Sequence, residues 1–324
     1  MRKAHRVLLL IAMSAHLQLI AHAGAQSYPS RPIRMIIPNP PGGSLDIVAR
    51  LVGPKIAEIT GQSVIIDNRP GADTIIGTEI VARAPADGYT VLLNTLPFVV
   101  NPAMSSKLPF DVVRDFAPVS LIVSVPFVLV VNNSVPARSV KEFIALAKAQ
   151  PGKLTYSSAG SGSNLHVAAE LFKNMTGTDM LHVQYKGGGP ALLAVLSGEV
   201  DLSYLNVAAV VPHVKAGKLR ALGMTSTQRS AALPELATIA ESGVPGYEFT
   251  SWVGALVPAA TPAQTVAELN ALITKSVRAP DLSKRFAEQG AEIIAGSPAQ
   301  FAAHIKAELA RWAKVVKESG MKAD

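Results

Sequence analysis

The chain has 324 residues, of which 49% are hydrophobic, 5% aromatic and 16% charged, and it carries a formal net charge of +7 with no cysteine. The absence of cysteine excludes disulfides, thiol catalysis and thiolate metal sites. Because the charges are dispersed and aromatic residues are few, the composition also argues against nucleic-acid binding.

The first 25 residues have the three parts of a secretory signal. The basic start holds Arg2, Lys3 and Arg6. An apolar run follows over residues 7–13, and the small residues Ala23 and Ala25 stand at the spacing that a signal peptidase recognises. We predict cleavage after Ala25, which lowers the net charge from +7 to about +4 because three basic and no acidic residues are removed. A retained membrane anchor is the alternative, but His16 and Gln18 interrupt the apolar run before the roughly twenty residues that a span requires.

After the signal, short β-rich runs alternate with longer segments of helical period, which is typical of an α/β protein with mainly parallel sheets. The expected strands are residues 33–37, 64–67, 90–93, 119–122, 128–131, 154–157, 182–184, 201–204, 219–224 and 252–257. The expected helices are residues 45–60, 74–83, 140–150, 163–176, 190–197, 207–216, 262–278, 282–289 and 298–319. Roughly 300 mature residues suit two lobes, each with its own core.

Two segments are expected to cross between these lobes. In residues 117–133 two apolar strands are separated only by Ser124-Val125-Pro126, and residues 233–252 are rich in turn-forming glycine and proline. The chain would then build lobe 1 from residues 26–123 and 250–324, and lobe 2 from residues 124–249. This is the plan of a binding protein that closes about a hinge.

Two glycine-rich turns are candidates for a ligand site, one in each predicted lobe. The first turn, residues 38–46, joins a strand to an amphipathic helix, and residues 158–164 do the same before the helix that carries His166. A strand, a glycine-rich turn and a helix in this order direct free backbone N–H groups and the positive helix end at one point, which suits an anion. Either turn alone also fits an α/β connection without a ligand, so the prediction depends on the pair.

A third turn, residues 185–190, has the same setting within lobe 2, and its Lys186 is more typical of a solvated surface lysine than of a ligand contact.

The known sequence motifs of enzymes are each broken at a particular position of this chain. Gly42-Gly43-Ser44 lacks the lysine of a phosphate-binding P-loop, and Leu165 stands where the dinucleotide fingerprint needs glycine. The sequence has no Gly-x-Ser-x-Gly elbow, and the four histidines after the signal include no pair at i and i+4 that would suggest zinc.

Eight short motifs, in order along nearly the whole mature chain, are shared with one family. They are Tyr28-Pro29-Ser30-Arg31-Pro32-Ile33, Pro40-Pro41-Gly42-Gly43 with Asp46, Asn68-Arg69-Pro70-Gly71-Ala72, Ala86-Asp87-Gly88-Tyr89-Thr90, Asp115-Phe116-Ala117-Pro118-Val119, Tyr156-Ser157-Ser158-Ala159-Gly160 with Gly162 and His166, Tyr185-Lys186-Gly187, and Gly198-Glu199-Val200-Asp201. At these residues the chain resembles the solute receptors of tripartite tricarboxylate transporters, often called Bug receptors. Each motif alone is weak, whereas the ordered set is specific.

The resemblance implies a two-lobe periplasmic binding protein fold of the Venus-flytrap type (type II), and a periplasmic location. It also implies a small carboxylate (a mono- or dicarboxylate or an amino acid) held between the two turns without cofactor or metal, and delivery of that solute to a membrane transporter. We expect a monomer that binds no nucleic acid. Asn39 and Ser44 depart from the residues that are commoner in the family, which bears on ligand specificity but not on the fold.

The predicted ligand contacts follow from the matched positions and from strand ends that face the same cleft. They are Pro41, Gly42, Gly43, Ser44 and Asp46 on the first turn, Ser158, Gly160, Gly162, Ser163 and His166 on the second, and Asn94, Tyr185, Asp201 and Asn206 elsewhere. Thr95, Tyr204 and Trp252 are weaker candidates at strand ends. Asp201 could contact a ligand amine or only order the end of its strand, and His166 could equally be structural.

Two other functions stay open at this point. A sensory receptor would bind the same ligand but dock on the outer domain of a histidine kinase, and the sequence has no readable docking motif that separates the two. An exported enzyme would use Asp46, His166 or Asp201 in acid–base chemistry, a role to which the failed templates give no support.

Overall fold

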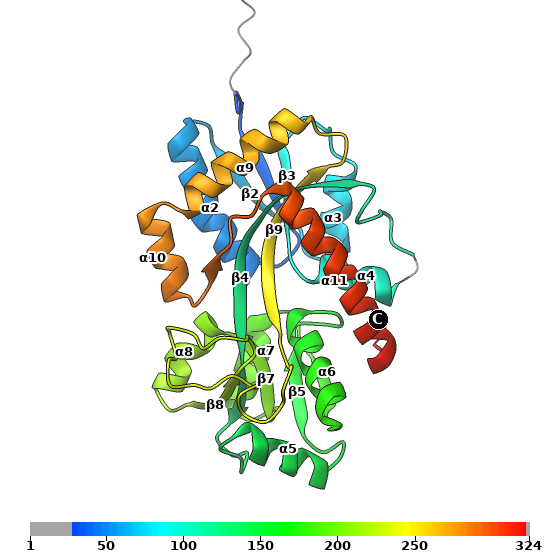
Figure 1. The fold of residues 1–324 in the computed structure, drawn as a ribbon, viewed down its shortest axis with the longest axis vertical. Coiled ribbons are helices and arrows are strands. Elements are labelled where there is room, and N and C mark those ends of the chain that lie inside the picture. The colour runs from blue at the N-terminus through cyan, green and yellow to red at the C-terminus, as the bar shows by residue number, and fades with distance from the viewer. Residues whose placement is uncertain (1–27, 106, 322–324) are drawn as a thin grey trace, which may run out of the picture.

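The computed structural model describes residues 28–105 and 107–321, and the expected signal peptide with its cleavage site lies outside them. The molecule is elongated, with two lobes joined by long strands (Figure 1). We call the half that contains β1 to β3 lobe 1, and the half that contains β5 to β8 lobe 2. The division at residues 123/124 and 249/250 stays a prediction.

Lobe 1 is built around three parallel strands, with β1 in the middle. The strands are β1 (Ile33–Ile37), β2 (Val64–Asn68) and β3 (Thr90–Asn94), and the helices are α2 (Ser44–Thr60), α3 (Ile75–Ala82), α4 (Pro97–Met104), α9 (Ala263–Val277) and α10 (Pro280–Glu288). The buried face of α2 repeats with helical spacing at Leu45, Val48, Val52 and Ile56. The helix stops at Gly61, which takes the left-handed conformation that favours glycine.

Lobe 2 repeats this plan, with β5 between the parallel strands β6 and β7. Its elements are α5 (Val140–Ala149), β5 (Thr155–Ser158), α6 (Asn164–Thr176), β6 (Leu181–Gln184), α7 (Gly188–Ser197), β7 (Leu202–Asn206), α8 (Val207–Lys215) and β8 (Leu219–Met224). In each lobe, therefore, the loops that follow the carboxyl ends of parallel strands lead into helices at one edge of the sheet.

Two antiparallel strands connect the lobes, β4 (Phe116–Asn132) and β9 (Thr250–Pro258). The expected break at Ser124-Val125-Pro126 was wrong, because β4 is continuous over 17 residues. Its first part pairs with β9 and with the short β10 (Glu292–Ile293), and its last part pairs with β7 and β8. Pro126 is the last residue paired with β9, and the pairing with β7 begins at the next residue, Phe127, so the proline stands at the boundary of the two regions, where a missing N–H group is tolerated.

The sheet is therefore mixed, and the parallel order expected for each lobe holds only for the outer strands. Along the path β2-β1-β3-β9-β4-β7-β5-β6, the central pairs that involve β9 and β4 are antiparallel. The physical reason is the connectivity: a chain that enters lobe 2 on β4 and returns on β9 runs in opposite directions on the two strands.

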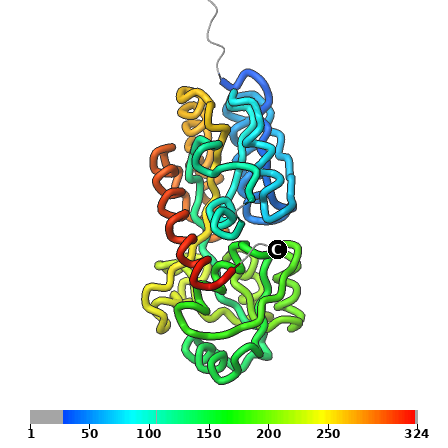
Figure 2. The backbone as a smooth tube through the Cα atoms, turned by 90° about the vertical axis from the view of Figure 1, so that its right-hand side faces the viewer, coloured from blue at the N-terminus to red at the C-terminus, as the bar shows by residue number. Residues whose placement is uncertain are grey.

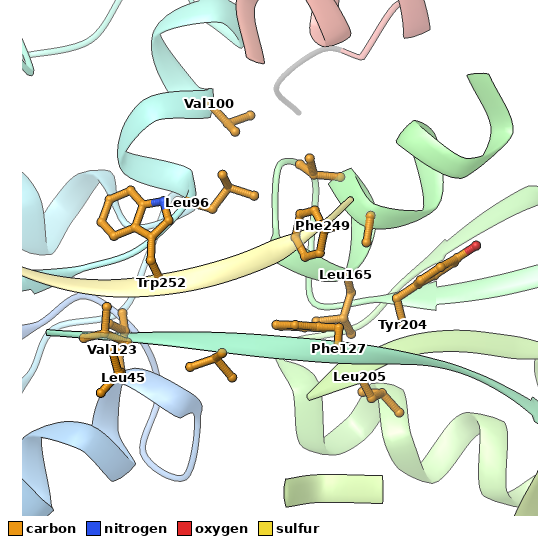
Figure 3. Close-up of a cluster of buried hydrophobic side chains, with 14 of the residues drawn as sticks. Leu45, Leu96, Val100, Val123, Phe127, Leu165, Tyr204, Leu205, Phe249 and Trp252 are labelled. Atoms are coloured by element: carbon orange, nitrogen blue, oxygen red, sulfur yellow. The ribbon is translucent and has the colours of Figure 1, made fainter. Parts of the chain in front are cut away.

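A hydrophobic cluster surrounds the crossing strands and draws side chains from both lobes (Figure 3). Phe127 on β4 and Phe249, next to β9, meet edge to face with ring centroids 5.5 Å apart. Trp252 packs in the same way against Phe301, at 5.5 Å. Burial of these large rings stabilises the crossing region by roughly 2–3 kcal/mol per side chain, so the connection between the lobes is part of the core.

The last helix, α11 (Pro298–Ser319), forms a third connection. It begins with a capping box, in which the Ser297 hydroxyl accepts from the Gln300 N–H and the Gln300 side chain accepts from the Ser297 N–H. The helix extends beside lobe 2 (red in Figure 2), where Asn174 Nδ2 donates to Glu318 Oε2 at 3.1 Å. One helix thus contacts both lobes.

Most expected helices and strands agree with the structure to within a few residues, and two elements were missed. Residues 97–104 form α4, but the segment is apolar throughout and contains two prolines, so it shows no helical period. The other is the two-residue strand β10, which is too short to leave a pattern in the sequence.

Candidate functional site

A cleft of about 700 Å³ lies between the lobes. It is lined by residues 38–43, 70–74 and Pro97 of lobe 1, and by Ala159, Gly160, Ser163 and residues 184–190 of lobe 2. The volume is in the range of small-molecule sites in proteins. The two lobes also touch here: a Cβ atom on Gly160 would lie 3.1 Å from Asp73 Oδ1, and one on Gly162 would lie 2.9 Å from Met104 Sδ.

Four helices begin at this cleft, two from each lobe. The residues that precede α2, α3, α6 and α7 are Gly43, Thr74, Ser163 and Gly187, and all four line the cleft. The first N–H groups of a helix have no partner within the helix, and its amino end carries a partial positive charge. The cleft therefore offers backbone donors to an anion from both sides.

Asp46 holds the first turn in shape from behind. Its Oδ2 accepts from the Gly42 N–H at 3.0 Å and from Arg50 Nε at 2.8 Å, and its Oδ1 accepts from Asn68 Nδ2 at 3.0 Å. Burial acts to raise the pKa of Asp46, but the hydrogen bonds from Arg50, Gly42 and Asn68 outweigh it and hold the pKa below its usual value. Gly42 takes a left-handed conformation with φ of 87°, which favours glycine.

The second turn is held by its own hydroxyl groups. Ser158 Oγ accepts from the Gly160 N–H at 3.1 Å and lies 2.5 Å from His182 Nε2. Ser163 Oγ accepts from the Ala159 N–H at 3.2 Å and caps α6 by accepting from the His166 N–H. Gly160 and Gly162 have φ of 119° and 73°. Short side chains and glycine therefore leave the backbone of this turn facing the cleft.

His166 shapes the second turn and does not reach the cleft. Its Nδ1 accepts from the Gly162 N–H at 3.1 Å, and its ring stacks on His182 with centroids 4.0 Å apart. Only 6% of the residue is exposed. Of the two roles weighed for His166, this geometry favours the structural one.

The structure brings six of the predicted ligand contacts together in the cleft. They are Pro41, Gly42, Gly43, Gly160, Ser163 and Tyr185. Ser44 and Asn206 instead meet in a separate pocket of about 20 Å³ between the lobes. Ser158 and Gly162 belong to the second turn but do not line the cleft, and Asp46 and His166 support the two turns through hydrogen bonds from glycine N–H groups.

Asn94 and Asp201 do not line the cleft. Asn94 is fully buried, where its Nδ2 donates to Thr78 Oγ1 at 2.9 Å. Asp201 precedes β7, so it lies at the amino end of the lobe 2 strands, opposite the cleft, and its Oδ2 accepts from the Thr155 N–H at 2.7 Å. Of the two roles considered for Asp201, only the ordering of the strand end fits this position. Asn206 caps α8 by accepting from the Ala209 N–H.

Some cleft residues were absent from the predicted contacts. Residues 70–74 form another turn in lobe 1. This turn follows β2 in the same way that residues 38–46 follow β1. The sequence did contain a signal for this turn, because Pro70 and Gly71 stand between an expected strand and an expected helix. Asn39 and Lys186 also line the cleft, although Lys186 looked like a solvated surface residue from the sequence. Asp73 and Lys186 are the charged side chains among the lining residues.

The comparison with known families decides the classification. Residues 48–321 match the model of the tripartite tricarboxylate transporter family receptor. The chain belongs to the tripartite tricarboxylate transporter receptor family. This is a family of periplasmic solute-binding receptors, and the resemblance inferred from the eight motifs is confirmed. No helix in residues 28–105 or 107–321 combines the length and apolar character that a membrane crossing requires.

Relatives of this receptor family cover most of the chain. Protein BugT of Bordetella pertussis is 38% identical over 306 residues, which cover 94% of each chain. The structure described as R. palustris Rpa4515 with adipate is 38% identical, with a TM-score of 0.86 over 91% of this chain and 99% of that one. MatC of Rhodopseudomonas palustris with bound malate is 30% identical, with a TM-score of 0.83 over 89% and 100%. The α/β periplasmic binding protein fold is thereby confirmed.

Proposed function

We propose that this receptor captures a small carboxylate between its two lobes and delivers it to a membrane transporter of the tripartite tricarboxylate class. The observation that carries the proposal is the convergence of four helix amino ends on one cleft, two from each lobe. A ligand that accepts hydrogen bonds from both sides stabilises the closed arrangement over the open one. The adipate and malate held by the two relatives support a carboxylate as the ligand.

The backbone donors suffice for a useful affinity. Micromolar binding corresponds to about −8 kcal/mol, and hydrogen bonds to a charged group contribute roughly 1.5–3 kcal/mol each. Four such bonds contribute about 6–12 kcal/mol, so strong bonds reach micromolar affinity when ordering the loops and closing the lobes costs no more than about 4 kcal/mol. The protein would act by capture and release, without a covalent step, as a monomer in the periplasm.

A thermal-shift screen of small carboxylates, followed by calorimetry, tests the binding. A ligand at one hundred times its Kd stabilises the folded state by about 2.7 kcal/mol, which for a chain of this size raises the Tm by about 5 °C. The proposal is wrong if no carboxylate in the screen raises the Tm.

A matched pair of substitutions tests the location of the site. Gly43→Asp places a carboxylate at the first residue of the anion site, and aspartate is favoured at a helix N-cap, so α2 should stay folded. A Cβ atom there would meet only the Pro40 carbonyl oxygen, at 3.8 Å. Like-charge repulsion should weaken ligand binding by at least about tenfold. Ala279→Asp adds the same group at the N-cap of α10, outside the cleft lining, and should leave the Kd unchanged.

Uptake measurements test delivery to a transporter. A strain that lacks the gene should lose uptake of the ligand found by calorimetry, and the wild-type gene, but not Gly43→Asp, should restore it. Uptake that persists in the deletion strain, together with retained ligand binding in vitro, would point instead to a sensory role.

A further inference from the structure

The turn that leads into α3 has a strained backbone. Ala72, Asp73 and Thr74 have positive φ angles of 44°, 47° and 76°, and all three residues line the cleft. We call residues 72–74 the left-handed turn. Residues with a Cβ atom visit the left-handed region singly and not in runs, because Cβ crowds the following carbonyl oxygen. Strain of this kind persists where neighbouring groups hold it, and it is concentrated at functional sites.

Side chains from outside the left-handed turn hold its main-chain oxygens. The Asp73 oxygen accepts from Asn101 Nδ2 of α4 at 2.7 Å. The Thr74 oxygen accepts from Thr78 Oγ1 at 2.8 Å, and Asn94 Nδ2 donates to the same hydroxyl at 2.9 Å. The side chains of Thr78, Asn94 and Asn101 are all buried. The left-handed turn is therefore fixed from the interior of lobe 1.

Asn101 is a polar residue in an otherwise apolar helix. The sequence of α4 over Pro97–Met104 is PFVVNPAM, and Asn101 is only 6% exposed. Burial of an amide costs free energy unless the amide is hydrogen-bonded, and the bond to the Asp73 oxygen meets this need. Asn101 also stands at the boundary of the lobes, since a Cβ atom on Gly162 would lie 3.5 Å from its Oδ1. One side chain thus adjoins the left-handed turn of lobe 1 and the second turn of lobe 2.

We propose that Asn101 is a positioning residue of the ligand site, whose amide holds the left-handed turn in the conformation that meets the ligand. This inference rests on the proposed function and concerns the same cleft. Without the Nδ2 donor, residues 72–74 would relax toward the right-handed and extended conformations that residues with a Cβ atom prefer. The apparent Kd would then rise in inverse proportion to the fraction of molecules that keeps the left-handed turn.

Hydrogen exchange in the ligand-free protein tests the first step. The Ile75 N–H donates to the Ala72 oxygen at 2.9 Å, and the Thr78 N–H donates to the Thr74 oxygen at 3.1 Å. Both N–H groups therefore report on opening of the left-handed turn. In Asn101→Ala they should exchange at least about fivefold faster than in the wild type, because local opening becomes more frequent.

A buried amide elsewhere in lobe 1 provides the matched control. Asn270 Nδ2 donates to the main-chain oxygens of Val119 at 2.8 Å and Gly296 at 2.9 Å, and none of these residues lines the cleft. Asn270→Ala should therefore lower the midpoint of urea unfolding, as Asn101→Ala does, but should leave the exchange of the left-handed turn unchanged.

Calorimetry tests the consequence for binding. The probes are adipate and malate first, and otherwise the carboxylate that raises the wild-type Tm most in the screen. Asn101→Ala should raise the Kd at least about tenfold, whereas Asn270→Ala should change it less than about twofold. If Asn101→Ala fails to fold, Asn101→Ser replaces it, because the serine hydroxyl is too short to reach the Asp73 oxygen.

The outcomes separate this inference from the proposed function. Unchanged exchange of the left-handed turn in Asn101→Ala, or an equal change of Kd in Asn101→Ala and Asn270→Ala, would overturn the inference and leave the proposed function standing. If no carboxylate binds the wild-type protein, the proposed function fails and the inference fails with it.

Discussion

At the scale of single residues, charged and polar side chains of this receptor act mainly behind the ligand site. Asp46 and His166 each accept a hydrogen bond from a glycine N–H, and so fix the shape of the turn in front of them. The surface offered to a ligand is largely glycine, proline and backbone. Asp46 and His166, which were predicted as ligand contacts, therefore position the main chain of the two turns.

Asp46→Asn should lower the free energy of unfolding by about 2 kcal/mol at pH 7, because the amide has no charge to hold Arg50 and keeps only one oxygen, so it cannot also accept from Asn68 Nδ2. The folded pKa of Asp46 is lowered, relative to an unfolded value near about 3.9. Its contribution is therefore complete above about pH 5 and is lost as the pH falls through the folded pKa. Urea denaturation from pH 7 to pH 3 should show the difference from wild type shrinking below about pH 4. A difference that grows on acidification would contradict this.

At the scale of elements, the approach of α11 to the crossing strands depends on one glycine. A Cβ atom on Gly254 of β9 would lie 2.1 Å from Cζ and 2.6 Å from Cε1 of Phe301, which is fully buried. Only glycine lets the ring of Phe301 lie against the strand. The contact joins the helix that bridges the lobes to one of the strands that connects them.

Gly254→Ala should destabilise the protein by about 1–3 kcal/mol, because the new methyl group overlaps a ring that has no free space. Chemical denaturation measures the change. Adding Phe301→Leu should recover part of the loss, so the double variant is more stable than the sum of the two single effects predicts. Gly296→Ala is the control, since its Cβ would meet Leu121 at an ordinary 3.5 Å. Strict additivity would show that the two residues do not interact.

At the scale of the whole molecule, the connections between the lobes bear on their closure, and the expected signal peptide bears on export. The lobes are joined by β4, β9 and α11, and the cleft lies between the turns at their facing edges. Closure about these connections, as proposed above, would bring together the helix ends of both lobes. Export would precede this activity, because the expected signal lies before residue 26.

Ligand binding should reduce the radius of gyration in small-angle X-ray scattering, because the bound anion draws the two turns together. Gly43→Asp, measured at the same ligand concentration, should keep the scattering profile of the free protein. A profile that stays unchanged in the wild type at saturating ligand would show that binding needs no closure.

Processing after Ala25 should give a periplasmic protein whose intact mass corresponds to a first residue of Gln26. Mass spectrometry of the periplasmic fraction measures it. Recovery of the chain in the membrane fraction, with its mass starting at Met1, would contradict cleavage and favour a retained anchor.

The local features of this protein were predictable from the sequence alone. Helical period and the Ser297-Pro298 start place α11 at its observed bounds, and glycine-rich turns between strands and helices mark three of the four loops at the cleft. These features depend on neighbouring residues, because caps, turns and amphipathic faces are set within a few positions of the chain. The ordered motifs added the family, and with it the two-lobe fold.

Only the tertiary structure decided which residues line the cleft. Asp201 and Gly160 both adjoin strands of the same sheet, yet the parallel direction of β5 and β7 places them at opposite ends. The continuity of β4 through Pro126 and the burial of Asn39 Oδ1 likewise depend on strands and loops far apart in the chain. Burial and strand direction are properties of packing between distant segments. Local pattern therefore revealed the turns, whereas packing selected the residues that line the cleft.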